Sequence, residues 1–432
     1  MKPPSPAGRM APSDRIGPFR LLFPVAVLAA AFLHFWIHTT PVRLATPDDV
    51  EFQAVVDQGN ATEYLATHAR EQGRFLYCTP IYRFALFSFY EVRDAPVFSL
   101  LRTTALFAQI ALTAWLTARV LQSAALGTAL ALLLAGTLHI PITYYLVLSF
   151  PPIWIGFSAV LGALHCHYTY LHRPGFLSGL MAGLLFLLAL MMHDVFVIFL
   201  PLFIGLSVLQ GKLLWRSLLS RNIIPLAVAF AYVAVHRRFA AEFPSSYAGT
   251  QFSWDLLLAT KVLLRQLIGV IPGFELFVNR VSAETTSPLW RELPAVIGTL
   301  GLLTWFDLLL ALGLALAVAD TFQTGLMEPS PHAGLWPWAL GFACLANLPI
   351  ALSAKYQVFI LHREFPYEYA WFSYFFLGIA TVSILAWRGQ RIPAGRNRRL
   401  LVVTVGTMTF LLCLSALASN HRVLHFLQER LN

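Results

Sequence analysis

The chain has 432 residues, of which 58% are apolar and 12% are charged. Soluble domains average roughly 45–50% apolar and about 25% charged residues, so the composition excludes an ordinary soluble or disordered protein and indicates a polytopic membrane protein. The formal charge of +9 does not indicate a nucleic-acid partner, because no module of interleaved basic and aromatic residues accompanies it.

Apolar runs close to the ~20 residues that cross a bilayer follow one another along most of the chain. They fall at about 20–38, 100–119, 124–139, 153–171, 176–192, 195–210, 223–239, 297–318, 337–354, 369–387 and 400–418. The pattern predicts one all-α domain over residues 1–432 with about eleven transmembrane helices. The runs within 176–210 could form either two short helices or one re-entrant hairpin.

The Lys and Arg residues set the predicted orientation, because short cytoplasmic loops retain them. The tail 1–19 is basic and is therefore predicted to be cytoplasmic. If the runs alternate, three later basic segments lie on the same side, at Arg173, 212–221 and 388–399. The same alternation places two long segments, 39–99 and 240–296, outside the membrane.

Both outer segments carry apolar residues at helical spacing, which predicts amphipathic helices along the membrane surface. In the first segment, Gly59-Asn60 and Gly73 are expected to break the helices. In the second, Lys261 and Arg265 are four residues apart and share one helical face.

Two adjacent carboxylates, Asp48 and Asp49, come shortly after the first apolar run. Thr46 suits an N-cap, Pro47 suits the first helical position, and Asp49 lies three residues after Thr46, as in a capping box. On this interpretation the residues only begin a helix. Glu51 lies three residues after Asp48 and could share its face.

An acidic pair beyond the first of many spans, followed by outer helices, resembles the GT-C superfamily of membrane glycosyltransferases. The segment EQGRFLYCTP (71–80) is similar to a Gly-Arg-aromatic element of bacterial GtrII-like glucosyltransferases. The segment AGLLFLLALMMHDVFVIFLPLFI (182–204) is similar to the span, polar pair, span pattern of many GT-C proteins, dolichyl-phosphate-mannose mannosyltransferases among them. His193 and Asp194 depart from that pattern, since a Lys-Glu or similar pair is common at this turn.

The resemblance implies an enzyme that moves a sugar from a polyprenyl-phosphate donor to a glycan, lipid or protein acceptor. It further implies a bacterial inner (plasma) membrane, with the active site on the periplasmic or external face. An acidic residue of the first outer loop is the usual base in this superfamily, which makes Asp48 and Asp49 the candidates. A carboxylate near a helix N-terminus is ionised at neutral pH and can deprotonate an acceptor hydroxyl. Neighbouring helical positions point about 100° apart, so the choice between the two stays open.

The phosphate leaving group needs cations, and the basic residues on the outer side are the candidates. We favour Arg74, which follows a glycine, and Lys355, whose Lys-Tyr-Gln phrase resembles an outer-end element of GtrII-like proteins. Lys261 and Arg265 are further candidates. Each of these side chains could instead extend toward anionic lipid headgroups.

No cofactor is expected. Carboxylate oxygens such as those of Asp48 and Asp49 suit Mg²⁺ or Mn²⁺, but no third ligand is spaced to complete a site. GT-C enzymes with lipid-monophosphate donors also generally resemble metal-independent catalysts. We expect Glu51, His193 and Asp194 to contact substrate instead.

One rival hypothesis belongs to a different class of protein. Asp307 falls in the middle of a predicted span, where an ionised carboxylate tends to be paired or functional. With His193 and Asp194 it could form the proton relay of a lipid-linked sugar flippase or a proton-coupled transporter. The two long outer segments favour the transferase, and a ligase or polymerase of lipid-linked glycans would share them.

Overall fold

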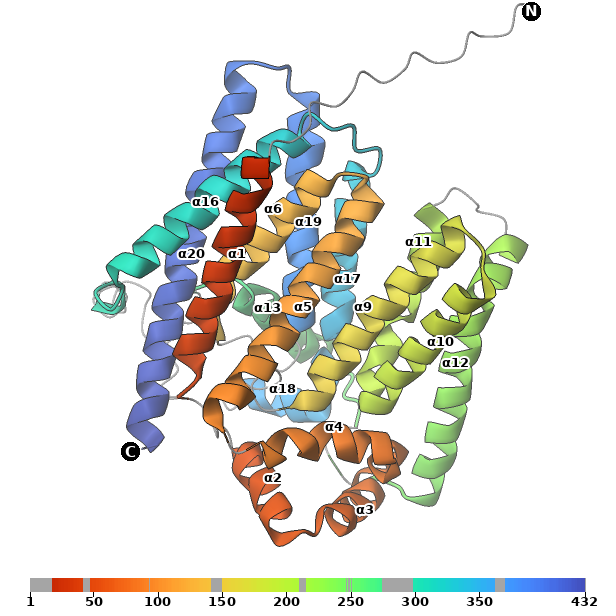
Figure 1. Ribbon diagram of the computed structural model, residues 1–432. Coiled ribbons are helices and arrows are strands. Elements are labelled where there is room, and N and C mark those ends of the chain that lie inside the picture. The colour runs from red at the N-terminus through yellow and green to blue at the C-terminus, as the bar shows by residue number, and fades with distance from the viewer. Residues whose placement is uncertain are drawn as a thin grey trace, which may run out of the picture.

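The computed structural model describes residues 18–41, 47–92, 94–140, 150–209, 215–245, 247, 249, 251–273, 298–361 and 370–431. Helices and turns make up this part of the chain, with one isolated antiparallel bridge between Phe252 and Ser353 and no named strand. The predicted all-α class is confirmed. Long helices run between two ends of the molecule, and a layer of short helices covers one of these ends (Figure 1).

Every predicted apolar run overlaps a helix of the bundle. These helices are α1 (Pro18–Thr39), α5 (Ala95–Leu121), α6 (Ala124–Gly136), α9 (Pro151–His172), α10 (Phe176–Met192), η2 (Asp194–Phe199) with α11 (Leu200–Leu209), α12 (Trp215–Glu242), α16 (Trp305–Gly325), α17 (Trp336–Ala351), α19 (Ala370–Arg391) and α20 (Arg396–Leu431). Within the described residues, 7 helices are long and apolar enough to cross a membrane, whereas α6, α10 and η2 with α11 are shorter. The chain is therefore an all-α integral membrane protein, and the count of eleven crossings stays a prediction.

The two ends of the bundle differ in their connections. The turns from α9 to α10 and from α19 to α20, which carry Arg173, Arg391 and Arg396, lie at the end opposite to α2, α3 and α4 (Figure 1). This separation is what alternating spans predict. Which end faces the cytoplasm stays a prediction from the Lys and Arg distribution.

The first outer segment folds into a layer made of α2 (Pro47–Gln58), α3 (Ala61–Gln72), η1 (Phe75–Cys78) and α4 (Pro80–Glu91). Its helices break at Gly59-Asn60 and at Gly73, as predicted. Phe52, Leu65 and Tyr90 are among the buried side chains of a hydrophobic core within this layer, and Phe150, just before α9, packs against it. The layer is thus a packed unit that can hold side chains over the end of the bundle.

Two further short helices complete this end. They are α13 (Leu256–Gly269) and α18 (Ala354–Leu361). The stretch 251–253 pairs with the start of α18, because Ala354 N donates to Gln251 O at 2.9 Å and Ser253 N donates to Leu352 O at 2.8 Å. Residues 246, 248, 250 and 274–296 of the predicted segment 240–296 lie outside the described residues.

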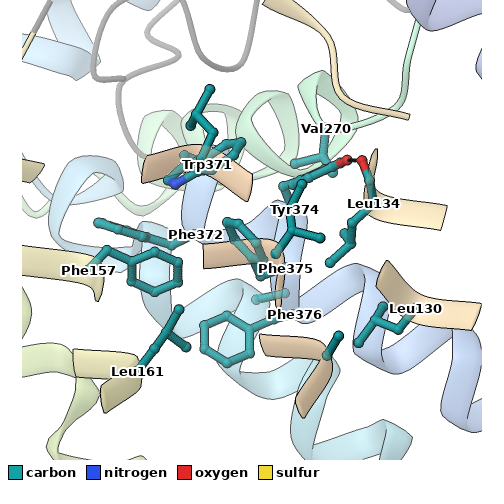
Figure 2. Close-up of a cluster of buried hydrophobic side chains, with 14 of the residues drawn as sticks. Leu130, Leu134, Phe157, Leu161, Val270, Trp371, Phe372, Tyr374, Phe375 and Phe376 are labelled. Atoms are coloured by element: carbon teal, nitrogen blue, oxygen red, sulfur yellow. Dashed lines mark hydrogen bonds between the residues drawn. The ribbon is translucent and has the colours of Figure 1, made fainter. Parts of the chain in front are cut away.

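Aromatic residues of α19 fill the centre of the bundle (Figure 2). Phe372 and Phe375 pack against Phe157 of α9, with ring centroids 5.0 and 5.1 Å apart. Trp371 Nε1 donates to Gln109 Oε1 at 2.9 Å, and Tyr374 OH donates to the carbonyl oxygen of Leu134. These bonds satisfy polar atoms that would be costly to bury unpaired in an apolar interior.

The prediction for Asp307 was wrong. It lies in the first turn of α16, not in the middle of a span, because the helix begins later than the apolar run 297–318. Thr304 and Asp307 form a capping box, in which Thr304 N donates to Asp307 Oδ2 at 2.7 Å and Asp307 N donates to Thr304 Oγ1 at 3.2 Å. Hydropathy alone does not register such a cap.

Candidate functional site

A cavity of about 570 Å³ opens between the layer of α2, α3 and α4 and the adjoining end of the bundle. Side chains from α2, η2, α12 and α18 and from the loop around 247–252 line it. Six of the sequence candidates are among the lining residues: Asp48, Glu51, Arg74, His193, Asp194 and Lys355. The fold therefore gathers two acidic, two basic and two adjacent turn residues from segments far apart in the sequence.

Asp48 and Glu51 lie one helical turn apart in the first part of α2 and both face this cavity. Tyr64 of α3 donates its hydroxyl hydrogen to Glu51 Oε1 at 2.9 Å. Burial, followed by the hydrogen bond to Glu51, raises the pKa of Tyr64 above its usual range, so the phenol keeps its proton. Asp48 sits in the first turn, where the helix dipole favours a negative charge.

Asp49 points elsewhere. Its side chain is fully buried, and it accepts a hydrogen bond from Tyr90 OH at 2.9 Å. It is not among the described residues that line the cavity. Burial and the Asp49 carboxylate raise the pKa of Tyr90. Thr46, the predicted partner of Asp49 in a capping box, lies outside the described residues.

Arg74 reaches the cavity from a backbone turn that only glycine fits. Gly73 ends α3 with a φ of +63°, and a Cβ at this position would lie 2.8 Å from the carbonyl oxygen of Phe243. Arg74 follows Gly73 directly, and its Nη1 donates to Tyr77 OH at 3.2 Å. The glycine thus lets the backbone before Arg74 lie close to Phe243.

Arg74, Asp194 and His193 form one charged group at the wall of the cavity. Arg74 Nε lies 3.4 Å from Asp194 Oδ2, and His193 Nδ1 lies 2.8 Å from Asp194 Oδ1. Burial would raise the pKa of Asp194, but Arg74 and His193 outweigh it, so this pKa lies below its usual range. Asp194 is therefore an anion that orients Arg74.

Lys355, at the start of α18, lies among aromatic rings. Its Nζ donates to Tyr247 OH at 3.0 Å. The same atom lies 5.5 Å from the ring centroid of Tyr247, 5.3 Å from that of Tyr356 and 5.5 Å from that of Phe359. Ring faces attract a cation, so the ammonium group is held at the cavity wall rather than extended toward lipid.

Lys261 and Arg265 do not join the residues that line the cavity. Both lie on α13, where Lys261 is exposed and Arg265 is half-buried, and neither is among the described lining residues of the cavity. The prediction that they share one face of a helix is confirmed. The structure does not bring that face to the cavity.

Several lining residues escaped the sequence analysis. Tyr64 and His68 are stacked on α3 with ring centroids 4.1 Å apart, and His236 and Tyr247 line the same cavity. Spacing of four residues could have placed Tyr64 and His68 on one face. No local pattern marks His236 or Tyr247, because they join the cavity only through contacts between distant segments.

Comparison with family models, with curated proteins and with solved structures finds no match. The cavity and the chemistry of its side chains are therefore the features that indicate a function.

Proposed function

We propose that the protein is an integral membrane glycosyltransferase that moves a sugar from a polyprenyl-phosphate donor to an acceptor hydroxyl at the cavity under α2, α3 and α4. The observation that carries this proposal is the cavity, which combines carboxylates on one helix with cations held on other segments. It lies at the end of helices apolar enough to cross a membrane. A donor with a lipid tail and a charged phosphate needs a charged cavity for the phosphate and a membrane beside it for the tail.

Asp48 is the base in this proposal. General-base catalysis needs a carboxylate within reach of the hydroxyl that it deprotonates, and Asp48 lines the cavity whereas Asp49 is buried against Tyr90. Asp48 lies in the first turn of α2, at the end of the helix dipole that favours negative charge. Glu51, which is fixed by Tyr64, would accept a second hydrogen bond from the acceptor.

Arg74 and Lys355 bind the donor phosphate in this proposal. Transfer leaves negative charge on the phosphate, and fixed cations stabilise that charge. Arg74 presents a planar guanidinium suited to phosphate, with Asp194 orienting it. Lys355 supplies a point charge beside Tyr247.

The transporter hypothesis joins His193 and Asp194 to Asp307 in one relay. In the structure the two carboxylates have different partners: Asp194 contacts Arg74 and His193, while Asp307 contacts His34 and His421. The transferase needs only the first group. A ligase or polymerase of lipid-linked glycans would use the same cavity with a longer glycan.

The proposal is tested with purified protein in nanodiscs, a panel of polyprenyl-phosphate sugars and candidate acceptor glycans and lipids. We expect release of free lipid phosphate with at least one donor, increased by an acceptor. Folded protein that releases none across the panel, and that drives proton-coupled uptake in vesicles, would replace the transferase with the transporter.

A further inference from the structure

A second polar cluster lies on three helices of the bundle. His34 and His38 are four residues apart on α1, and so share one helical face. They meet His421 of α20 and Asp307 of α16. The described lining of the candidate active cavity includes none of these four residues, so the proposed function leaves the cluster unexplained.

The three imidazole rings converge. One ring nitrogen of each of His34, His38 and His421 lies within 4.8 Å of those of the other two. The rings of His34 and His38 are stacked with centroids 4.0 Å apart, and the ring of His421 stands at 85° to that of His38, at 5.1 Å.

Oxygen acceptors hold these rings in place. His34 Nε2 donates to Asp307 Oδ1 at 2.7 Å, and His421 Nε2 donates to Asp307 Oδ2 at 3.0 Å. His38 Nδ1 lies 2.9 Å from the carbonyl oxygen of His34. Metal-binding histidines characteristically have a carboxylate or carbonyl partner that fixes ring orientation and tautomer.

We propose that His34, His38 and His421 bind one divalent transition-metal ion, with Zn²⁺ as the preferred species, and that Asp307 supports the site. Imidazole is a good ligand for Zn²⁺, and three histidines are a known zinc donor set. The Asp307 carboxylate offsets part of the charge of the ion, either as a fourth ligand or as the partner of two ring nitrogens.

The distances fit a zinc ion after the rings move together. Zinc–nitrogen bonds of about 2.0–2.1 Å in a tetrahedral site place two ligand nitrogens about 3.4 Å apart. The upper limit of 4.8 Å therefore needs a contraction of up to about 1.4 Å, which we assign to rotation of the half-buried His38 and His421 rings. Both side chains also line a cavity of about 330 Å³ with Leu302 and His425, which gives the ion a path to the cluster.

Such an ion would tie α1, α16 and α20 together near the end of the bundle that carries α2, α3 and α4. Asp307 is in the first turn of α16, His34 and His38 are in the last two turns of α1, and His421 lies late in α20. The ion is thus predicted to stabilise the folded state, since binding energy at a site absent from the unfolded chain adds to folding energy.

The test uses the full chain, purified in detergent with a tag that contains no histidine. The protein is stripped with a chelator, dialysed against Zn²⁺ or Co²⁺, and analysed for bound metal by mass spectrometry. We expect one ion per chain, visible absorption bands of tetrahedral Co²⁺, and a higher midpoint of thermal unfolding with Zn²⁺ than with chelator. These measurements use the wild-type protein, so they test metal binding even if a variant fails to fold.

Substitutions then assign the ligands. His38→Gln and His421→Gln should each lose stoichiometric metal, and Asp307→Asn should weaken affinity by at least about 10-fold, as loss of a supporting carboxylate does. His172→Gln is the matched control, because His172 lies at the end of α9, a helix that carries none of the cluster residues, and its Nδ1 lies 2.9 Å from the carbonyl oxygen of Tyr168. It should bind metal like the wild type.

Wild-type protein that retains no metal, or metal binding that His38→Gln and His421→Gln leave unchanged, would overturn the proposal. In that case the cluster is a hydrogen-bonded network in which a shared proton balances the buried charge of Asp307. These experiments measure bound metal and thermal unfolding, not donor turnover. Their result therefore does not bear on the proposed transferase function, which is tested separately.

Discussion

Asp48 and Asp49 show how adjacent side chains on one helix turn acquire different surroundings. The sequence offers no choice between them, because both follow the same proline and either could face a cavity. Packing decides it: α4 places Tyr90 against Asp49, while Asp48 lines the cavity. The contact joins residues 41 positions apart, and a local pattern cannot predict such a contact.

A structural role for Asp49 gives the first prediction. Its carboxylate accepts from Tyr90 and interacts electrostatically with the fully buried Arg102. Asp49→Asn removes that charge but keeps an oxygen that can accept from Tyr90, and we expect a loss of about 1–3 kcal/mol of stability, typical of a lost interaction with a charged group. The apparent midpoint of thermal unfolding in detergent measures it. Asp57→Asn on the exposed side of the same helix is the control and should stay near the wild type.

Lys355 gives the second prediction. Lys355→Gln keeps much of the side-chain length but removes the charge, so the donor phosphate should bind about 10- to 100-fold more weakly, as expected when a hydrogen bond to a charged group is lost. Affinity for a radiolabelled polyprenyl phosphate in nanodiscs measures the effect. Lys261→Gln on α13 serves as the control, and an equal loss in both variants would point to headgroup attraction rather than a phosphate site.

At the scale of elements, the sequence predicts the helices well because each buries an apolar surface in lipid or in the bundle. It also predicts the breaks at Gly59-Asn60 and Gly73, since glycine tolerates the backbone that ends a helix. It misplaces the start of α16, where Thr304 and Asp307 form a cap inside the region that hydropathy marks as a span. It misses the histidine cluster as well, because α1 and α20 meet only in the folded bundle.

The turn after α3 gives the third prediction. Gly73→Ala should reduce turnover strongly, because its Cβ would clash with the carbonyl oxygen of Phe243 at 2.8 Å and displace Arg74. Gly59→Ala is a matched control: its φ is also positive, at +69°, but nothing lies within 4 Å of an added Cβ. Gly59→Ala should cost about 1–2 kcal/mol of stability from backbone strain alone, with nearly normal turnover. Turnover and unfolding midpoint are measured together on both variants, and equal turnover in the two would remove the argument for Arg74.

For the whole molecule, the gathering of basic turns at one end and of α2, α3 and α4 at the other predicts the orientation in the membrane. After replacement of the native cysteines, Gln58→Cys should react with a membrane-impermeant maleimide in intact cells. Ala394→Cys, in the turn between α19 and α20, should react only after permeabilisation. Labelling of position 394 from outside would reverse the predicted orientation of the protein in the membrane.

The central claim is that the Asp48 carboxylate in this cavity deprotonates the acceptor of a sugar held on polyprenyl phosphate. The most direct measurement is the rate of lipid-phosphate release by Asp48→Asn, relative to the wild type, in nanodiscs with a donor that the wild type uses and equal amounts of inserted protein. An amide cannot accept a proton at neutral pH, so the account predicts a rate lower by a factor of about 10² to 10⁴, with donor binding retained. A rate equal to that of the wild type would contradict it and leave Asp48 as part of a helix start alone.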